Sequence, residues 1–203
     1  MLHRVHRLAA SFIGLYALLH LANHLAALGG IERHVAFMQG VRQVFRIPAI
    51  EALLLLCVAY QFGSGLYFVA RRWGQRRARF DRLQALSGLY LAFFLLAHVS
   101  SVLYGRVALS LDTNFYFAAA GLHIGPYAVF FAPYYGLAIV ALGTHLACAF
   151  RYLAAGRLRP VTRDRIVLAS VAGAAVLASL ILATFSGAFY PITIPQEYAA
   201  TFR

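Results

Sequence analysis

Five apolar runs, each about twenty residues long, constrain the fold of this chain more than any other feature. They cover residues 8–28, 48–70, 83–104, 129–152 and 166–187. A helix rises about 1.5 Å per residue, so each run is long enough to cross a hydrocarbon core of about 30 Å. Lipid offers no partner for backbone N–H and C=O groups, so segments that cross it are helical. We therefore predict an all-α, polytopic membrane protein that forms a single integral membrane domain over residues 1–203.

The arginines fall into two unequal sets according to which connection they occupy. The chain has a net charge of +12 and 18 basic residues, all of them arginine. Thirteen lie before the first run or in the connections 71–82 and 151–165, and five lie in 29–47, 105–128 and 188–203. Positively charged connections stay on the cytoplasmic side of a membrane, so we predict a cytoplasmic N-terminus and a C-terminus outside. This charge is a topology signal at a lipid surface, and we expect no nucleic-acid partner.

The sequence lacks motifs that are typical of several classes of soluble enzyme. It contains no glycine-rich dinucleotide loop, no CxxC pair and no arrangement typical of a nucleophile triad. The two cysteines, Cys57 and Cys148, lie inside apolar runs, where cysteine usually serves as a small buried hydrophobic residue. The aromatic stretch NFYFAAAGLHIGPY within 105–128 is typical of a re-entrant or interfacial cap rather than a free loop.

Four of the eight histidines lie inside apolar runs, where an ionisable side chain is a functional-site hypothesis by default. His24 and His98 each come late in a run that crosses outward, so both are predicted in the outer half of the membrane at similar depth. His145 comes late in an inward run and is predicted in the inner half. His20 lies one turn from His24 on the same helix face. The remaining histidines lie near or beyond the membrane edges and are given no role: His3, His6, His34 and His123.

Two of these histidines end matched sequence repeats. GLYALLHLANH (residues 14–24) and GLYLAFFLLAH (residues 88–98) both begin with glycine and end with histidine ten residues later. Facing helices of a bundle commonly supply cofactor ligands, and two histidines at one depth can be the axial ligands of a haem. Gly14 and Gly88 would leave room for a flat macrocycle. An isolated intramembrane histidine more often bonds a helix carbonyl, but the matched repeat favours ligation.

On these residues the chain resembles the fused five-helix cytochrome b membrane anchor of succinate:quinone oxidoreductases and quinol:fumarate reductases, the dihaem type. The resemblance covers nearly the whole chain and implies a four-helix haem-binding bundle in the bacterial inner membrane. It implies that His24 and His98 ligate the outer haem b. His20, whose place Phe94 takes in the second repeat, is expected to line the haem pocket or to bond within the bundle. The resemblance also implies flavoprotein and iron–sulfur subunits docked on the cytoplasmic side, with this chain passing electrons to quinone rather than carrying the dehydrogenase chemistry.

The run FRIPAIEALLLL (residues 45–56) is similar to the start of the second helix in that family. Glu51 resembles an acidic group that the family places by its quinone and proton-transfer site, and Arg46 lies close to it in sequence. The alternative is that Glu51 is an ordinary acid in the first turn of a helix, just after Pro48, where it complements the helix dipole.

The inner haem of the family is where this sequence departs from the pattern. The family uses one histidine on the second helix and one on the fourth. His145 matches the latter, but Gln61 stands where the former is expected, and glutamine is a poor haem ligand. Three alternatives stay open: an outer haem alone; a second haem on His145 with an unusual partner, for which His20 is a poor depth match; or His145 as a hydrogen-bonding core residue.

Two rival functions also stay open at the level of sequence. One is a stand-alone bis-histidine membrane cytochrome b that works without a dehydrogenase. The other is a haem-free membrane anchor or assembly protein, in which the histidines only bond between helices.

Overall fold

The structure, a computed structural model, describes residues 1–75 and 78–202, and all regular secondary structure within them is helical. The long helices are α1 (Leu2–Ala26), α3 (Pro48–Arg72), α4 (Arg79–Val107), α6 (Ala128–Leu153) and α7 (Pro160–Phe185). Within the described residues these five are long and apolar enough to cross a membrane. The shorter helices are α2 (Ile31–Phe45), α5 (Phe115–His123) and α8 (Gln196–Ala199), with single 3-10 turns at Ala27–Gly29, Trp73–Gln75 and Ala200–Phe202. The predicted all-α, polytopic fold is confirmed.

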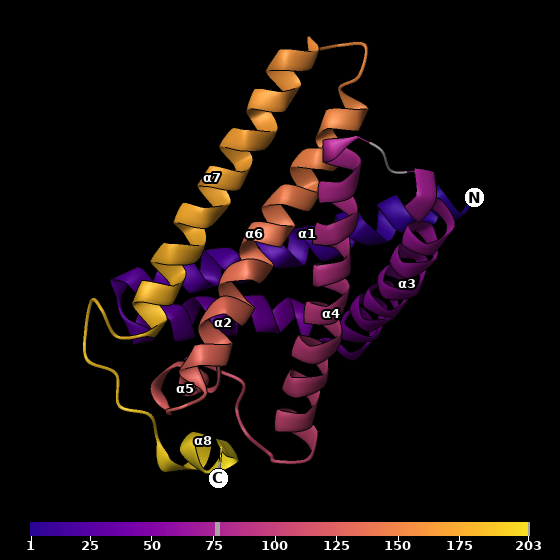
Figure 1. Ribbon diagram of the computed structural model, residues 1–203. Helices are drawn as coiled ribbons and strands as arrows, with labels where there is room; N and C mark the ends of the chain where they lie inside the picture. The colour runs from indigo at the N-terminus through magenta and orange to yellow at the C-terminus, as the bar shows by residue number, and fades with distance from the viewer. Residues whose placement is uncertain (76–77, 203) are drawn as a thin grey trace.

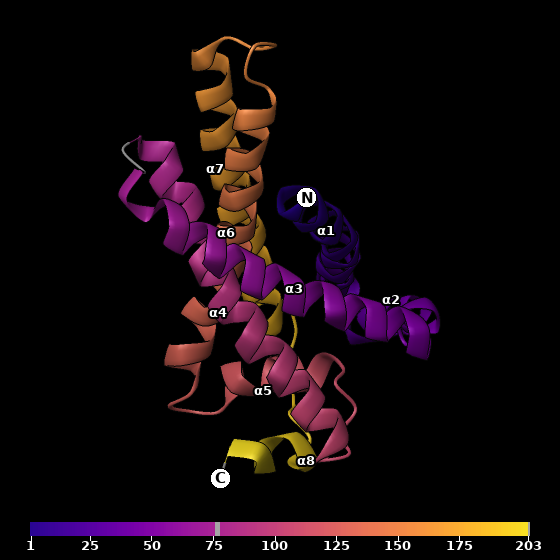
Figure 2. The ribbon, with the colours of Figure 1, turned by 90° about the vertical axis from the view of Figure 1, so that its right-hand side faces the viewer.

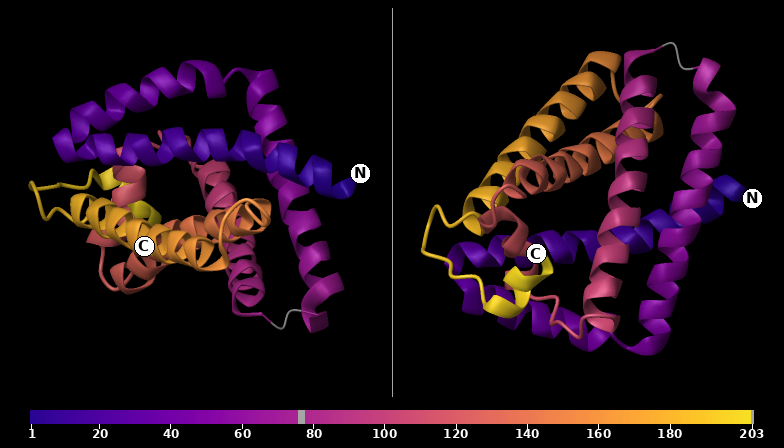
Figure 3. Two further views of the ribbon diagram at one scale, coloured as in Figure 1. Left: turned by 90° about the horizontal axis from the view of Figure 1, so that it is seen from above. Right: turned by 60° about the horizontal axis from the view of Figure 1, so that its bottom comes forward.

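The long helices are not all parallel. Helices α4, α6 and α7 run side by side, with α6 packed against both neighbours (Figure 1). Helix α1 crosses them steeply, and α2 returns antiparallel beside α1 (Figures 1 and 3). Figure 2 shows α3 running obliquely from the end of α2 to the start of α4, in contact with both α1 and α4. The sequence suggested that the first and third spans run parallel at equal depth, so this crossing changes which of their side chains meet.

Helix α2 lies within residues 29–47, which the sequence predicts to be a connection between the first two spans. Its ends carry the charges that a helix dipole favours, Glu32 in the first turn and Arg42 in the last. Its buried side chains, His34 and Met38, are four residues apart and therefore share one face. The helix ends shortly before Pro48, because the residue that precedes a proline is disfavoured in helical conformation. Too short and too polar to count as a span, α2 nevertheless brings its buried face against α1.

The predicted interfacial cap forms a packed layer at one end of the bundle. Helix α5 begins after Asn114, whose side chain accepts a hydrogen bond from the backbone N–H of Tyr116 at 2.9 Å. Phe115 is fully buried and packs with Phe185, which belongs to α7. Helix α8 lies beside α5 at the same end (Figure 1), and its Tyr198 hydroxyl donates to the backbone carbonyl of Asp112 at 3.0 Å.

Helices α6 and α7 approach closely because small residues face each other between them. A Cβ atom added to Gly143 would lie 2.6 Å from the Cβ of Ala174, which is well inside contact distance. Small residues at such interfaces let two membrane helices pack through their backbones. By contrast, a Cβ atom added to Gly173 on α7 would meet nothing within 4 Å.

We therefore expect Gly143→Leu to separate α6 from α7 and to cost about 1–3 kcal/mol of folding free energy, the usual effect of overpacking. The measurement is the melting temperature of the purified protein in detergent. Gly173→Leu is the matched control and should leave the melting temperature nearly unchanged. Equal losses in the two variants would contradict the close approach at Gly143.

Candidate functional site

Four histidines from three helices form one cluster: His20 and His24 from α1, His34 from α2 and His98 from α4. The Nε2 atoms of His20 and His24 lie 3.1 Å apart, and Nε2 of His34 lies 3.3 Å from Nδ1 of His24. The rings of His20 and His98 meet edge to face, with centroids 5.9 Å apart. Three of these histidines were candidates from sequence, and His34 was not.

The amide of Asn23 sets the direction of hydrogen bonding through the cluster. Its Nδ2 lies 3.0 Å from Nε2 of His34, and an amide nitrogen only donates, so this Nε2 accepts. Nδ1 of His24 lies 3.3 Å from the same Nε2 and is the donor in this longer contact, which shares the single lone pair of Nε2 with Asn23. This leaves Nε2 of His24 unprotonated, able to accept from Nε2 of His20 or to bind a metal. These tautomers are assigned from the hydrogen-bond network.

Two polar atoms of the cluster are buried without a hydrogen-bond partner among the described residues. They are Oδ1 of Asn23 and Nδ1 of His34. The residue His34 is only 2% exposed, and burial lowers its pKa to about 4. The ring is therefore neutral near pH 7, which is the form that accepts a hydrogen bond at Nε2.

Aromatic rings surround the imidazoles and give the cluster an apolar wall. Phe185 meets the rings of both His24 and His34 edge to face. Three further rings each contact one imidazole: Phe115 at His34, Phe94 at His98 and Tyr16 at His20. The imidazoles inside this apolar wall therefore lie in a region of low local dielectric.

The predicted ligand pair, His24 and His98, belongs to one cluster, but the two rings differ in their neighbours. The ring of His98 contacts His20 and Phe94, and no hydrogen bond joins it to another described residue. The ring of His24 is held by His34 and His20 instead. Because α1 crosses α4 steeply, the residue one turn earlier on α1 is the one that meets His98. The structure therefore offers His20 as well as His24 as a partner for His98, and the predicted pair stays a prediction.

The two repeat glycines occupy different surroundings. A Cβ atom added to Gly14 would meet nothing within 4 Å, so α1 has open space there. A Cβ atom added to Gly88 would lie 3.0 Å from Cε1 of His145. Gly88 therefore accommodates the imidazole of His145 on α6, and it does not leave open space beside His98.

His145 and Gln61 belong to a second polar group, nearer the opposite end of α1. Nδ1 of His145 lies 3.0 Å from the backbone carbonyl of Gln84, to which it donates. Nε2 of Gln61 donates to Nε2 of His6 at 2.9 Å, and Nδ1 of His6 lies 2.7 Å from Oγ of Ser64. His6 and His145 are close enough for their charges to interact. The α1 histidine whose charge interacts with that of His145 is therefore His6, which the sequence left without a role.

Glu51 forms an ion pair with Arg106 through both carboxylate oxygens, which links the start of α3 to the end of α4. Arg46 does not make this pair: its Nη2 donates to Oγ1 of Thr113 at 3.3 Å. Glu51 lies in the first turn of α3, as the alternative interpretation expected. In this arrangement its charge is already compensated by an arginine.

The four-histidine cluster presents imidazole nitrogens, groups that can serve as axial ligands of a haem. Within residues 1–75 and 78–202 no group of three or more His, Cys, Asp or Glu side chains is arranged to hold a metal ion. Haem requires fewer protein ligands than a bare metal ion does, because the porphyrin supplies four nitrogens and side chains supply only the axial ligands. The cluster offers imidazoles in an apolar wall. Nδ1 of His24 contacts His34, so Nε2 is the nitrogen that would ligate, and it would have to give up its contact with His20.

Comparisons with known protein families, with curated proteins and with solved structures found no match for this chain.

Proposed function

We propose that this chain is a membrane cytochrome b that binds haem b at the cluster of His20, His24, His34 and His98. The observation that carries this proposal is the convergence of four imidazoles from α1, α2 and α4 in a protein of membrane-spanning helices. Ionisable side chains are rare in such helices and usually have a function when they occur. Four of them in one apolar site would be costly without a ligand to bind.

The residues divide into ligands and supporting groups. His98 provides one axial nitrogen, and either His24 or His20 provides the other. His34 accepts a hydrogen bond from Nδ1 of His24. This contact orients the His24 ring and makes its Nε2 a more basic ligand for a metal. The aromatic rings exclude water from the site. Haem bound there would supply one-electron transfer, and its potential would depend on the axial ligands and on these surroundings.

The finer proposal is that this cytochrome is the membrane anchor of a complex similar to succinate dehydrogenase or fumarate reductase. It rests on the resemblance: five spans, the matched glycine and histidine spacing, and arginine-dense connections. The ends of α3 and α6 and the starts of α4 and α7 lie toward the end opposite α5 and α8 (Figure 1), so the described arginines there could face common flavoprotein and iron–sulfur partners. In this proposal the membrane is the bacterial inner membrane, the N-terminus is cytoplasmic and quinone binds near Glu51. A proton role for Glu51 would require its carboxylate to separate from Arg106.

One observation favours a second function, a haem-free anchor or assembly protein. The imidazoles of His24 on α1 and His34 on α2 contact each other directly, as they would if the histidines only joined helices. A reduced-minus-oxidised difference spectrum of the purified protein, supplied with haem, separates the two functions. A b-type band with a haem-to-protein ratio of at least about one supports the cytochrome, and its absence at saturating haem supports the haem-free anchor. Co-purification with a flavoprotein would then distinguish the complex anchor from a stand-alone cytochrome.

We expect His145→Ala to leave the haem at the four-histidine cluster in place, because His145 contacts Gly88 and Gln84 and is not a member of that cluster. The haem-to-protein ratio is the measurement. A wild-type ratio near one should be unchanged in the variant. A wild-type ratio near two that falls to one, both here and in His6→Ala, would assign a second haem to His6 and His145. Complete loss of haem in His145→Ala would contradict the proposed site.

A further inference from the structure

A cluster of charged side chains, separate from the four-histidine cluster, lies at the end of the bundle that carries α5 and α8. Three arginines meet there: Arg42 near the end of α2, Arg46 just after it, and Arg106 near the end of α4. Two carboxylates face them, Asp112 and Glu51. Three guanidinium groups against two carboxylates leave one positive charge uncompensated among these side chains.

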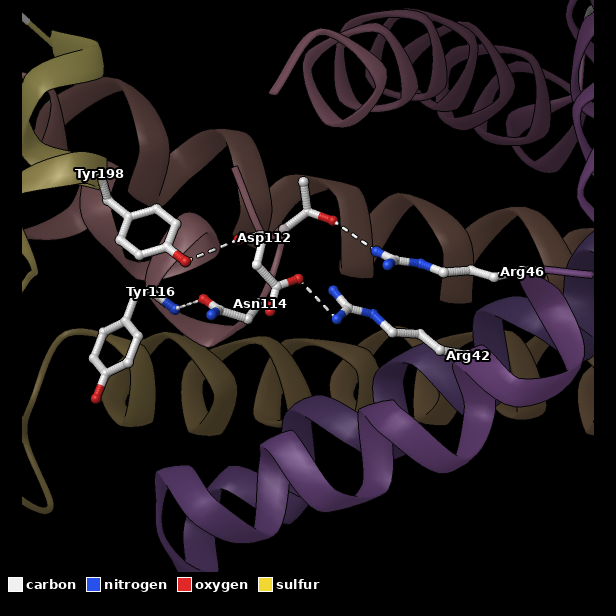
Figure 4. Close-up of polar contacts among 7 residues, drawn as sticks. Arg42, Arg46, Asp112, Asn114, Tyr116 and Tyr198 are labelled. Atoms are coloured by element: carbon white, nitrogen blue, oxygen red, sulfur yellow. Dashed lines mark hydrogen bonds and ion pairs between the residues drawn. The ribbon is translucent and has the colours of Figure 1, made fainter. Parts of the chain in front are cut away.

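Arg42 and Arg46 reach toward the same short segment of chain before α5 (Figure 4). Nη1 of Arg42 forms an ion pair with Oδ1 of Asp112 at 2.8 Å. Its other terminal nitrogen, Nη2, is buried and has no hydrogen-bond partner among the residues that the structure describes. A buried guanidinium N–H without an acceptor costs free energy, so this atom favours an additional acceptor.

Arg46 has no carboxylate of its own within the described chain. Its contact with the Thr113 hydroxyl is long and neutral, and the residue is exposed. Although the residue as a whole is exposed, desolvation of its guanidinium, together with the charges of Arg42 and Arg106, lowers the pKa of Arg46. Arginine does not give up its proton in proteins, so the repulsion among these groups is relieved by an anion rather than by deprotonation.

The segment that faces the two arginines is held in place. The Tyr198 hydroxyl donates to the carbonyl of Asp112, and the side chain of Asn114 accepts from the backbone N–H of Tyr116 (Figure 4). These bonds come from α8 and from the start of α5. The arginines therefore approach a fixed backbone rather than a free loop, which favours a defined binding geometry.

We propose that Arg42 and Arg46 form a binding site for a phosphate group. The guanidinium fork matches phosphate oxygens with paired, charge-assisted hydrogen bonds. A phosphodiester with one negative charge, bound at the exposed Arg46 beside Arg42, would neutralise the uncompensated charge. The site lies at one end of membrane-spanning helices, where lipid headgroups present such a group, and free phosphate presents the same chemistry. Asp112 competes with the anion for Arg42. This site does not depend on haem.

The test measures binding to the purified full chain in neutral detergent. The probes are a short-chain phosphatidylglycerol, the matching phosphatidylcholine, and inorganic phosphate, followed by native mass spectrometry and by thermal shift. We expect phosphatidylglycerol to bind more tightly than phosphatidylcholine, whose headgroup has no net charge. Competition by inorganic phosphate would identify free phosphate as a ligand, and a lack of competition would identify the lipid headgroup.

Two variants are expected to change the affinity for phosphatidylglycerol in opposite directions. Arg46→Gln should weaken phosphatidylglycerol binding about tenfold, the effect of removing a charged hydrogen-bond partner. Asp112→Asn should strengthen it, because the competing carboxylate is lost. Arg33→Gln is the matched control, since Arg33 is an exposed arginine in the first turn of α2, at the other end of that helix from Arg42 and Arg46. The proposal is overturned if Arg46→Gln and Arg33→Gln bind alike, or if Asp112→Asn binds more weakly than the wild type.

Discussion

His98→Ala is expected to remove haem from the purified protein, with loss of the b-type difference spectrum. His98 is the sole histidine that α4 contributes to the cluster, and its ring faces the imidazoles of α1. No hydrogen bond joins this ring to another part of the described chain, so its nitrogens are not already committed to a structural role. Without it the remaining histidines lie on α1 and α2, on one side of the site. The measurement is the haem-to-protein ratio after purification in the presence of added haem.

The same measurement on α1 variants identifies the partner of His98. His24→Ala should abolish binding if the pairing predicted from the repeats is right, and His20→Ala should then only weaken it. The reverse result would assign ligation to His20, whose ring is the one in contact with His98. Full haem retention in both single variants, each with an unchanged spectrum, would contradict bis-histidine ligation between α1 and α4.

A folding defect could also remove haem, so His98→Ala needs a matched control. Ser100→Ala lies half a turn further along α4 at an exposed position and should retain haem. If this variant and His98→Ala lost haem to the same extent, the loss would reflect the stability of α4 and not axial ligation.

The five spans were predictable from sequence because a membrane imposes one simple requirement, a run of apolar residues long enough to cross it. The predicted run at residues 48–70 corresponds to Pro48–Arg72, and the run at 129–152 corresponds to Ala128–Leu153. Both agree within two residues, since helix ends follow local signals such as Pro48 at the first turn of α3. The requirement acts on each run separately and says nothing about the angle between two runs.

That missing angle explains what the sequence could not predict about the site. Depth along a span placed His24 level with His98, but the crossing of α1 over α4 brings His20 into contact with His98. His34 was set aside because its segment is too polar to span. Its signal was the spacing of buried His34 and Met38 on one face of a short helix, four residues apart. An amphipathic reading of residues 31–45 would have found it.

His34→Phe is expected to weaken haem binding by about 10–100-fold without abolishing it, the usual effect of removing a group that orients a metal-bound histidine. Phenylalanine preserves the aromatic contacts with Phe115 and Phe185 but cannot accept the hydrogen bond from Nδ1 of His24. His24 would then be a less basic ligand, so the midpoint potential should shift in the positive direction. Haem titration and a redox titration of the purified protein measure the two effects.

His34→Gln restores an acceptor in the form of an amide oxygen and should recover part of both the affinity and the potential. This partial recovery is the readout that a merely space-filling role for His34 would not produce. Wild-type affinity and potential in His34→Phe would show that His24 is oriented by other groups, such as Phe185 and His20. Complete loss of haem in His34→Phe, with no recovery in His34→Gln, would instead make His34 itself an axial ligand. In that case α2, which is too short to span the membrane, would carry a residue that binds iron.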